Sequence, residues 1–326
     1  MSTPTVHVLA CGGTIASTPG DDGAAPTLTG DELIATVPGL ESLATITVEE
    51  VARTPGFDVA RSTVAEVGRL AEAATADAVV VTHGTDTIEE TAYHLDLALS
   101  VPTPIVVTGS QRRLDEPSSD APANLLAAVR AATDDRLRNA GGVYVAFNDE
   151  LHAARDVTKA HTSALETFES PGKGPVATLT RETIRFHREP GSRSASIPAL
   201  ESTAYVPVVS TGQGVDATTF SAVVDAGADG VVVAGTGLGN VTASLGEAIV
   251  GVADEVPVVV TSRCHAGAVE AVYGTPGGAV TLRRAGVIDG DDLPAWKARV
   301  KLALVCSVAD DVDEVRRYFE GVPGRH

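Results

Sequence analysis

The sequence predicts an α/β protein with two domains, each built around a parallel sheet. Short, continuously apolar runs such as residues 78–81 alternate with longer segments whose apolar residues recur at helical spacing. This alternation is typical of parallel strands covered by helices on both faces. The chain has 326 residues, and the stretch 189–204, rich in Ser, Pro and Gly, indicates a linker. We therefore expect a larger N-terminal domain over 1–188, doubly wound and flavodoxin-like, and a smaller C-terminal α/β domain over 205–326.

The order of apolar runs and amphipathic segments predicts the individual elements. In the first domain we expect strands at 6–10, 78–81, 104–108 and 143–147, and helices at 62–74, at 87–99 and from 119 onward. Ser62 is the expected N-cap of the first helix. In the second domain we expect helices at 217–226, 241–252, 294–305 and 310–320, and strands at 230–234 and 256–261.

Charge and hydropathy exclude several classes of partner. The formal net charge is −19, and such a field would repel nucleic acid and anionic membrane surfaces. No run reaches the roughly 18 consecutive apolar residues that a membrane span needs, and residues 1–13 lack the features of a signal peptide. We expect a cytoplasmic protein whose partners are neither nucleic acid nor a membrane.

Cysteine and histidine placement indicates neither disulfides nor a metal site. The three cysteines, Cys11, Cys264 and Cys306, are widely spaced in apolar surroundings and are interpreted as reduced core thiols. The histidines have no His or Cys partner at ligand spacing, so no metal site is expected. His83 is interpreted as a packed or hydrogen-bonded residue beside its turn.

Two loops that carry hydroxyl groups follow predicted strands, at 12–17 and at 82–87. Each lies at the carboxyl end of a strand, where open α/β sheets bind their ligands. The glycine pair before Thr14 permits a sharp turn that would leave the threonine hydroxyl facing the crevice. Such a hydroxyl can act as a nucleophile when a base removes its proton. The alternative is that Thr14 only forms a hydrogen bond within its turn.

The second loop leads into a predicted helix and allows two interpretations. Asp86 with Glu89, or Thr87 with Glu90, has the spacing of a capping box, which is a structural role. A helix N-terminus also attracts a carboxylate through its free N–H groups and dipole, while Asp86 could hold an ammonium group. A free amino acid carries both groups.

Lys159 is one of four lysines in the chain. Composition alone favours a solvated surface position for any lysine. A lysine desolvated in a cleft can nevertheless exchange a proton, whereas an arginine stays charged.

Four segments carry a resemblance to a known family. In chain order they read GGTIAS, THGTDTIEETAYHLDL, TGSQRR and FNDELHAARDVTKAHTSALETF. In sequence, order and spacing these segments resemble the bacterial-type L-asparaginase family, which includes asparaginases and glutaminases. The resemblance is close over most of residues 6–180 and looser over the remainder.

The resemblance implies an amidohydrolase that converts L-asparagine to L-aspartate and ammonia without a cofactor. It implies that Thr14 attacks the amide and forms an acyl-threonine intermediate. It also implies that Thr85, Asp86 and Lys159 form a second group, in which Thr85 and Lys159 handle protons and Asp86 binds the α-amino group of the substrate.

The remaining substrate contacts follow from the same resemblance. Gly56, Gly84 and Ser110 are expected to line the substrate site. Asn240 is expected to reach the active site of a neighbouring subunit in a homodimer or homotetramer. The alternative for Asn240 is that it caps the helix expected to begin at Val241.

Three positions depart from the family pattern. Residues 15–35, which form the mobile loop of the family, contain no tyrosine. The substrate-carboxylate serine of the family aligns with Gly56, so only a backbone N–H would remain there unless Thr54 compensates. The acidic residue that the family contributes from a neighbouring subunit has no counterpart around 277–281.

Two further functions compete with asparagine hydrolysis. One is glutamine hydrolysis, by a glutaminase-asparaginase or by an amidotransferase subunit that acts with tRNA. The other, of a different class, is a non-catalytic α/β module that binds an amino acid. The second has no need for two hydroxyls and a potential base.

Overall fold

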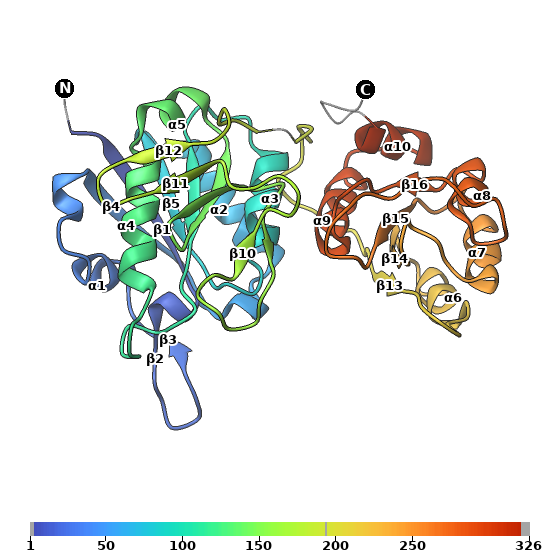
Figure 1. Ribbon diagram of the computed structural model, residues 1–326, viewed down its shortest axis with the longest axis horizontal. Coiled ribbons are helices and arrows are strands. Elements are labelled where there is room, and N and C mark those ends of the chain that lie inside the picture. Colours follow the sequence, from blue (N-terminus) through green and yellow to red (C-terminus); the bar gives the residue numbers. More distant parts are fainter. Residues whose placement is uncertain (1–2, 193, 321–326) are drawn as a thin grey trace. The chain divides into compact units, whose positions relative to one another are not determined.

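A computed structural model describes residues 3–192 and 194–320 of the chain (Figure 1). The chain divides into two compact units between Ser196 and Ile197. The limits 1–188, 189–204 and 205–326 for the domains and their linker remain a proposal. Each unit has a parallel sheet with helices packed on it, so the expected α/β class with a larger N-terminal and a smaller C-terminal domain is confirmed.

The N-terminal unit is built on a sheet of eight strands. Its five parallel strands lie side by side in the order β4 (Thr45–Thr54), β1 (Thr5–Gly12), β5 (Ala78–Thr82), β6 (Ile105–Thr108) and β7 (Val143–Phe147). Counted along the chain this order is 2-1-3-4-5, the flavodoxin-like order, and its direction reverses between β1 and β5. The antiparallel strands β8 (Glu150–Ala153), β11 (Ala177–Leu179) and β12 (Ile184–Phe186) extend the sheet beyond β7.

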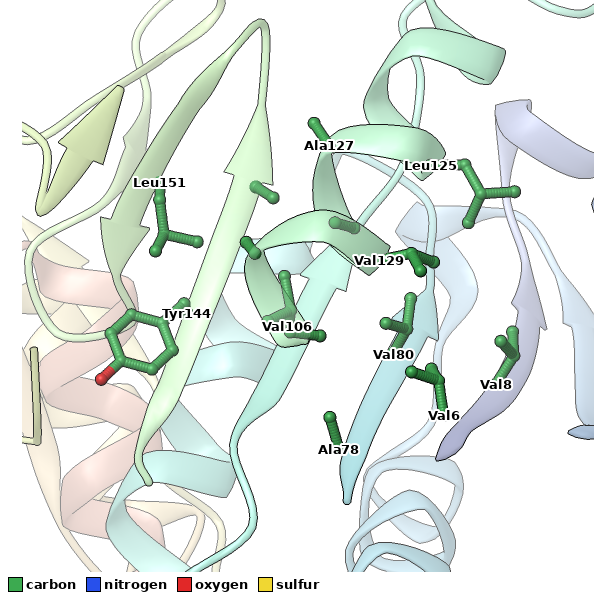
Figure 2. Packing of buried hydrophobic residues seen from close by; sticks show 14 of the residues in the cluster. Val6, Val8, Ala78, Val80, Val106, Leu125, Ala127, Val129, Tyr144 and Leu151 are labelled. Carbon is green, nitrogen blue, oxygen red and sulfur yellow. The ribbon is translucent and has the colours of Figure 1, made fainter. Parts of the chain in front are cut away.

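Helices cover both faces of this sheet. One face carries α1 (Gly30–Ala35) and α4 (Ala121–Ala132), and the other carries α2 (Arg61–Ala73) and α3 (Ile88–Ala98). Figure 2 shows alternate residues of neighbouring strands, Val8, Val80 and Val106 among them, on the side of Leu125 from α4. Every residue of β5, β6 and β7 is buried, which explains why these strands read as continuous apolar runs.

The predicted strands of this unit all form, but β4 was not predicted. It lies at the edge of the sheet, and none of its ten residues is fully buried. Its sequence, TITVEEVART, is correspondingly half polar and gives no apolar run. An edge strand of this kind cannot be found by searching for buried strands.

The predicted helix caps are wrong in three places. The helix expected at 62–74 begins at Arg61, and Ser62 is not its N-cap. Helix α3 has Thr87 as N-cap residue, but no side chain caps it, so neither expected capping box forms. Helix α7 is capped by the Thr242 hydroxyl, which accepts from Leu245 N, and Asn240 is therefore not its cap.

The C-terminal unit has a four-stranded parallel sheet in chain order. Its strands are β13 (Val208–Ser210), β14 (Val231–Gly235), β15 (Val258–Ser262) and β16 (Ile288–Asp289). The helices are α6 (Thr218–Asp225), α7 (Ala243–Val250), α8 (Ala279–Arg284), α9 (Ala295–Val305) and α10 (Val312–Glu320). A separate apolar core, which includes Val231, Val233 and Leu245, fills this unit.

The cysteines are free, but they do not all lie in a core. Cys11 is buried as expected, and this burial, with a smaller contribution from the nearby Glu50 carboxylate, raises the pKa of its thiol to about 12. Cys264 is exposed and Cys306 is half-buried, so the core interpretation is wrong for Cys264. No helix within 3–192 or 194–320 is both long and apolar enough to span a bilayer.

Candidate active site

Backbone contact among three glycines forms the floor of the candidate site. Gly13 follows β1, Gly56 follows β4 and Gly84 follows β5, so all three lie where the strand order reverses. A Cβ atom on Gly13 would lie 2.4 Å from Gly84 Cα, and one on Gly84 would lie 2.4 Å from Gly56 Cα. Gly13 also has a φ of +79°, a conformation that side chains rarely adopt. Only glycine therefore fits at Gly13 and Gly84, and the loops are held in contact.

Thr14 begins a short 3-10 turn directly after Gly13. The turn is held by Gly13 N, which donates to Thr54 O at 2.9 Å, and by the Ser17 hydroxyl, which donates to Gly13 O at 2.8 Å. Within the described parts of the chain, the half-buried Thr14 side chain makes no hydrogen bond of its own. Ser17, rather than Thr14, thus fills the turn-stabilising role that was the alternative for Thr14.

Lys159 joins the second hydroxyl loop through two side-chain contacts. Its Nζ donates to Thr85 Oγ1 and to Asp86 Oδ1, each at 2.8 Å. Thr85 is 5% exposed, and the side chains of Lys159 and Asp86 are 15% and 51% exposed. The structure therefore brings together the three residues that the resemblance associates, although Lys159 is more than 70 positions from the other two.

The backbone of Lys159 is held by a buried carboxylate. Lys159 lies in the short strand β9 (Thr158–Lys159), and its N–H donates to Glu89 Oε1 at 2.9 Å. Glu89 belongs to α3 and is 4% exposed. In place of closing a capping box with Asp86, Glu89 positions the strand that carries the lysine. The capping-box motif gave no signal for this contact.

His83 supports the carbonyl of the central glycine. Its Nδ1 lies 2.8 Å from Gly84 O and its Nε2 lies 3.0 Å from Thr91 Oγ1. A carbonyl can only accept, so Nδ1 carries the proton and Nε2 accepts from the Thr91 hydroxyl. His83 is 1% exposed, and this burial lowers its pKa, while the bond to Gly84 opposes the shift. The expectation of a packed, hydrogen-bonded histidine is confirmed.

Family models match both units of the chain. The family model described as "Asparaginase, N-terminal" matches residues 5–192, and the model "Glutaminase/Asparaginase C-terminal domain" matches residues 205–319. The chain belongs to the asparaginase family. The suspected membership is thus confirmed over both units.

Individual relatives resemble the chain over nearly its whole length. A probable periplasmic L-asparaginase of Haemophilus influenzae is 34% identical over 97% of this chain and 93% of its own length. A glutamyl-tRNA(Gln) amidotransferase component of Haloquadratum walsbyi is 36% identical over 98% of this chain but 75% of its own length. The crystal structure of a probable cytoplasmic L-asparaginase from Campylobacter jejuni superposes with a TM-score of 0.88 at 30% identity, covering 97% of this chain and 99% of that one.

The glycine contact explains one departure from the family. Gly56 stands where the resemblance places a carboxylate-binding serine, but a Cβ there would lie 2.8 Å from the carbonyl carbon of Gly84. Its own carbonyl accepts a hydrogen bond of 2.5 Å from the Thr87 hydroxyl, which is why Thr87 does not cap its helix. Thr54, whose compensation for the missing serine was left open, has a buried hydroxyl without a partner in the described chain.

Two other expected contact residues have their side chains engaged by the backbone of the protein. Ser110 is fully buried, and its hydroxyl donates to Arg112 O at 2.8 Å. Asn240 lies in the C-terminal unit, where its Oδ1 accepts from Ala279 N at 3.2 Å. The role of Asn240 stays a prediction. Nowhere in the described residues do three or more His, Cys, Asp or Glu side chains gather as a metal site would require.

Gln111 contacts the site and was missed by the sequence reasoning. It lies next to Ser110 in the TGSQRR segment, and its Oε1 accepts from the Thr85 hydroxyl at 3.1 Å. The sequence motif places Gln111 in a loop after β6 but gives no sign that the side chain turns toward Thr85. Only its position beside a residue already selected could have drawn attention to it.

The buried histidine predicts a pH-dependent stability. Above its ordinary pKa near 6.5 His83 is neutral in both the folded and the unfolded chain. As the pH falls below that value, the unfolded chain binds a proton before the folded chain does, so the free energy of unfolding decreases. Urea unfolding at pH 8, 7, 6 and 5 should show a smaller decrease for His83→Gln than for the wild type.

The exposed His187 provides the matched control for this measurement. The pH dependence should differ more from the wild type in His83→Gln than in His187→Gln, because His83 is the buried one of the two rings. An identical pH dependence in His83→Gln and the wild type would contradict the lowered pKa of His83.

Proposed function

We propose that this asparaginase-family chain hydrolyses L-asparagine to L-aspartate and ammonia without a cofactor. The observation that carries the proposal is the contact of Lys159 Nζ with both Thr85 and Asp86, at 2.8 Å each, beside the Thr14 turn at the reversal of strand order. Acyl transfer by an activated nucleophile needs a hydroxyl that can attack and a nearby group that can exchange protons with it. The Thr14 turn offers the first, and Thr85 paired with Lys159 offers the second.

The proposed reaction proceeds through an ester of Thr14. The Thr14 oxygen attacks the side-chain amide carbon of asparagine as its proton is removed, and the C–N bond then breaks to release ammonia, which takes up a proton. Water attacks the acyl-threonine ester, so that aspartate leaves and the Thr14 hydroxyl is restored. Thr85 and Lys159 are proposed to exchange protons with the reacting groups. For this, Lys159 must release one of its protons before it can accept another.

The substrate contacts are proposed from the groups that remain available. Asp86 uses Oδ1 for Lys159, while its Oδ2 has no hydrogen bond within the described chain and can accept from the α-ammonium of an amino acid. Gly56 and Gly84 offer only backbone groups. The hydroxyl of Ser110 is committed to its own loop, so its proposed contribution is also limited to the backbone.

Glutamine hydrolysis and pure binding are the competing functions. The amidotransferase component from Haloquadratum walsbyi is matched over 75% of its length, whereas the Haemophilus influenzae asparaginase is matched over 93%. The net charge of −19 favours the small-amide hydrolase over an amidotransferase that acts with tRNA. Ammonia release from asparagine and from glutamine at equal concentrations separates these functions. Release from neither amide would support the binding module.

Replacement of Thr14 should abolish turnover without unfolding the protein. Thr14→Ala removes the attacking oxygen at a half-buried position, and we expect the rate of ammonia release to fall at least about a thousandfold. Thr14→Ser keeps a hydroxyl and serves as the matched control, with partial activity. A folded Thr14→Ala protein, verified by circular dichroism, that still releases ammonia near the wild-type rate would exclude Thr14 as the nucleophile.

Lys159 should not tolerate arginine. Arginine keeps the positive charge beside Asp86 but cannot accept a proton, so Lys159→Arg should lose nearly as much activity as Lys159→Met. Steady-state rates of the two variants at pH 7 and pH 9 provide the measurement. An active Lys159→Arg enzyme would reduce Lys159 to an electrostatic role.

The chain is further proposed to act as a homodimer or homotetramer with an active site completed by Asn240 of a neighbouring subunit. Inactive Thr14→Ala subunits mixed with inactive Asn240→Ala subunits should regain activity as hybrids form, because one composite site then has both residues intact. Light scattering that shows a monomer, or proven subunit exchange without regained activity, would contradict the shared site.

A further inference from the structure

The hydroxyl of Thr85 has two protein partners, one that donates a hydrogen bond to it and one that accepts a hydrogen bond from it. Lys159 Nζ has only protons to offer, so Thr85 Oγ1 accepts from it at 2.8 Å. Gln111 lies on another side of the same oxygen, with its Oε1 at 3.1 Å. A hydroxyl has one proton and two lone pairs. The single proton of Thr85 is therefore directed to Gln111, and one lone pair remains for a substrate or a water molecule.

The orientation of the Gln111 amide is fixed by its other end. Gln111 Nε2 donates to Ala164 O at 3.1 Å. If the amide were rotated by half a turn, its oxygen would face the Ala164 carbonyl oxygen, and two acceptors would oppose each other. The amide oxygen must therefore point at Thr85.

The backbone of Gln111 is held independently of its side chain. Asp120 accepts from Gln111 N at 3.0 Å through Oδ2 and from Arg112 N at 2.9 Å through Oδ1. Asn124 in turn donates to Asp120 Oδ2 at 3.0 Å and to Gly109 O at 2.9 Å. A change in the Gln111 side chain thus leaves the anchors of its loop in place.

We propose that Gln111 is a positioning residue that fixes the direction of the Thr85 proton. This inference rests on the proposed function, because it assigns a role in amide hydrolysis. By accepting the proton, Gln111 prevents the hydroxyl from turning its proton toward the crevice. Thr85 then presents a lone pair there, which can accept a hydrogen bond from the attacking hydroxyl or water and so orient its oxygen for attack.

Two variants at Gln111 separate this role from a structural one. Gln111→Met has a similar length but no acceptor, so kcat should fall about tenfold while KM stays within about twofold, since one orienting hydrogen bond is lost. Gln111→Glu keeps an acceptor for Thr85 but loses the donor to Ala164. Its kcat should stay within about threefold of the wild type.

Ser119 supplies the matched control in the same loop. Its hydroxyl donates to Arg112 O at 3.2 Å and has no contact with Thr85. Ser119→Ala should therefore keep the wild-type kcat and KM. Thermal unfolding of all three variants should take place within a few degrees of the wild type, because the Asp120 anchors remain.

The same kinetic series contains the outcomes that would overturn the inference. Wild-type kcat in Gln111→Met would do so, and so would an equal loss in Gln111→Met and Gln111→Glu, which share only the loss of the bond to Ala164. A rise in KM at unchanged kcat would assign Gln111 to substrate binding instead. A wild-type enzyme that releases no ammonia from asparagine or glutamine would overturn the proposed function, and this inference with it.

Discussion

The close approach of Gly13, Gly56 and Gly84 is the constraint on which the rest of the site depends. The absence of side chains allows three loops, from three adjacent strands, to touch through their backbones. This contact places the turn of Thr14 next to the loop of Thr85, because each threonine directly follows one of the glycines. A methyl group at the centre of this packing would have to push two loops apart, and the two hydroxyls with them.

Around this floor, two buried side chains hold the backbone of the site. Glu89 anchors the backbone of Lys159, and His83 anchors the carbonyl of Gly84. Both side chains are almost fully buried, so their hydrogen bonds are protected from competing water. The polar atoms that could exchange protons are thus carried by elements with rigid supports, as the preorganisation of a site requires.

The structure explains one departure from the family pattern but not another. The absence of a side chain at Gly56 follows from the packing against Gly84, so serine cannot be restored there without displacing the β5 loop. The absence of a tyrosine in residues 15–35 has no such explanation in the structure. That segment contains the end of the Thr14 turn and the hairpin of β2 (Ser17–Thr18) and β3 (Ala25–Pro26), and none of its side chains is a phenol.

The sequence by itself determined the parallel α/β architecture and the identity of the hydroxyl loops, because buried strands and glycine turns are encoded by neighbouring residues. It did not reveal the edge strand β4, which carries the chain to Gly56 and has no apolar run. Tertiary structure also decided between competing partners. Thr87 bonds to Gly56 O instead of capping its helix, and Gln111 reaches Thr85 across 26 positions. These hydrogen bonds depend on which loops lie within hydrogen-bonding distance in the folded chain. The residues next to a donor or acceptor in the sequence do not determine that distance.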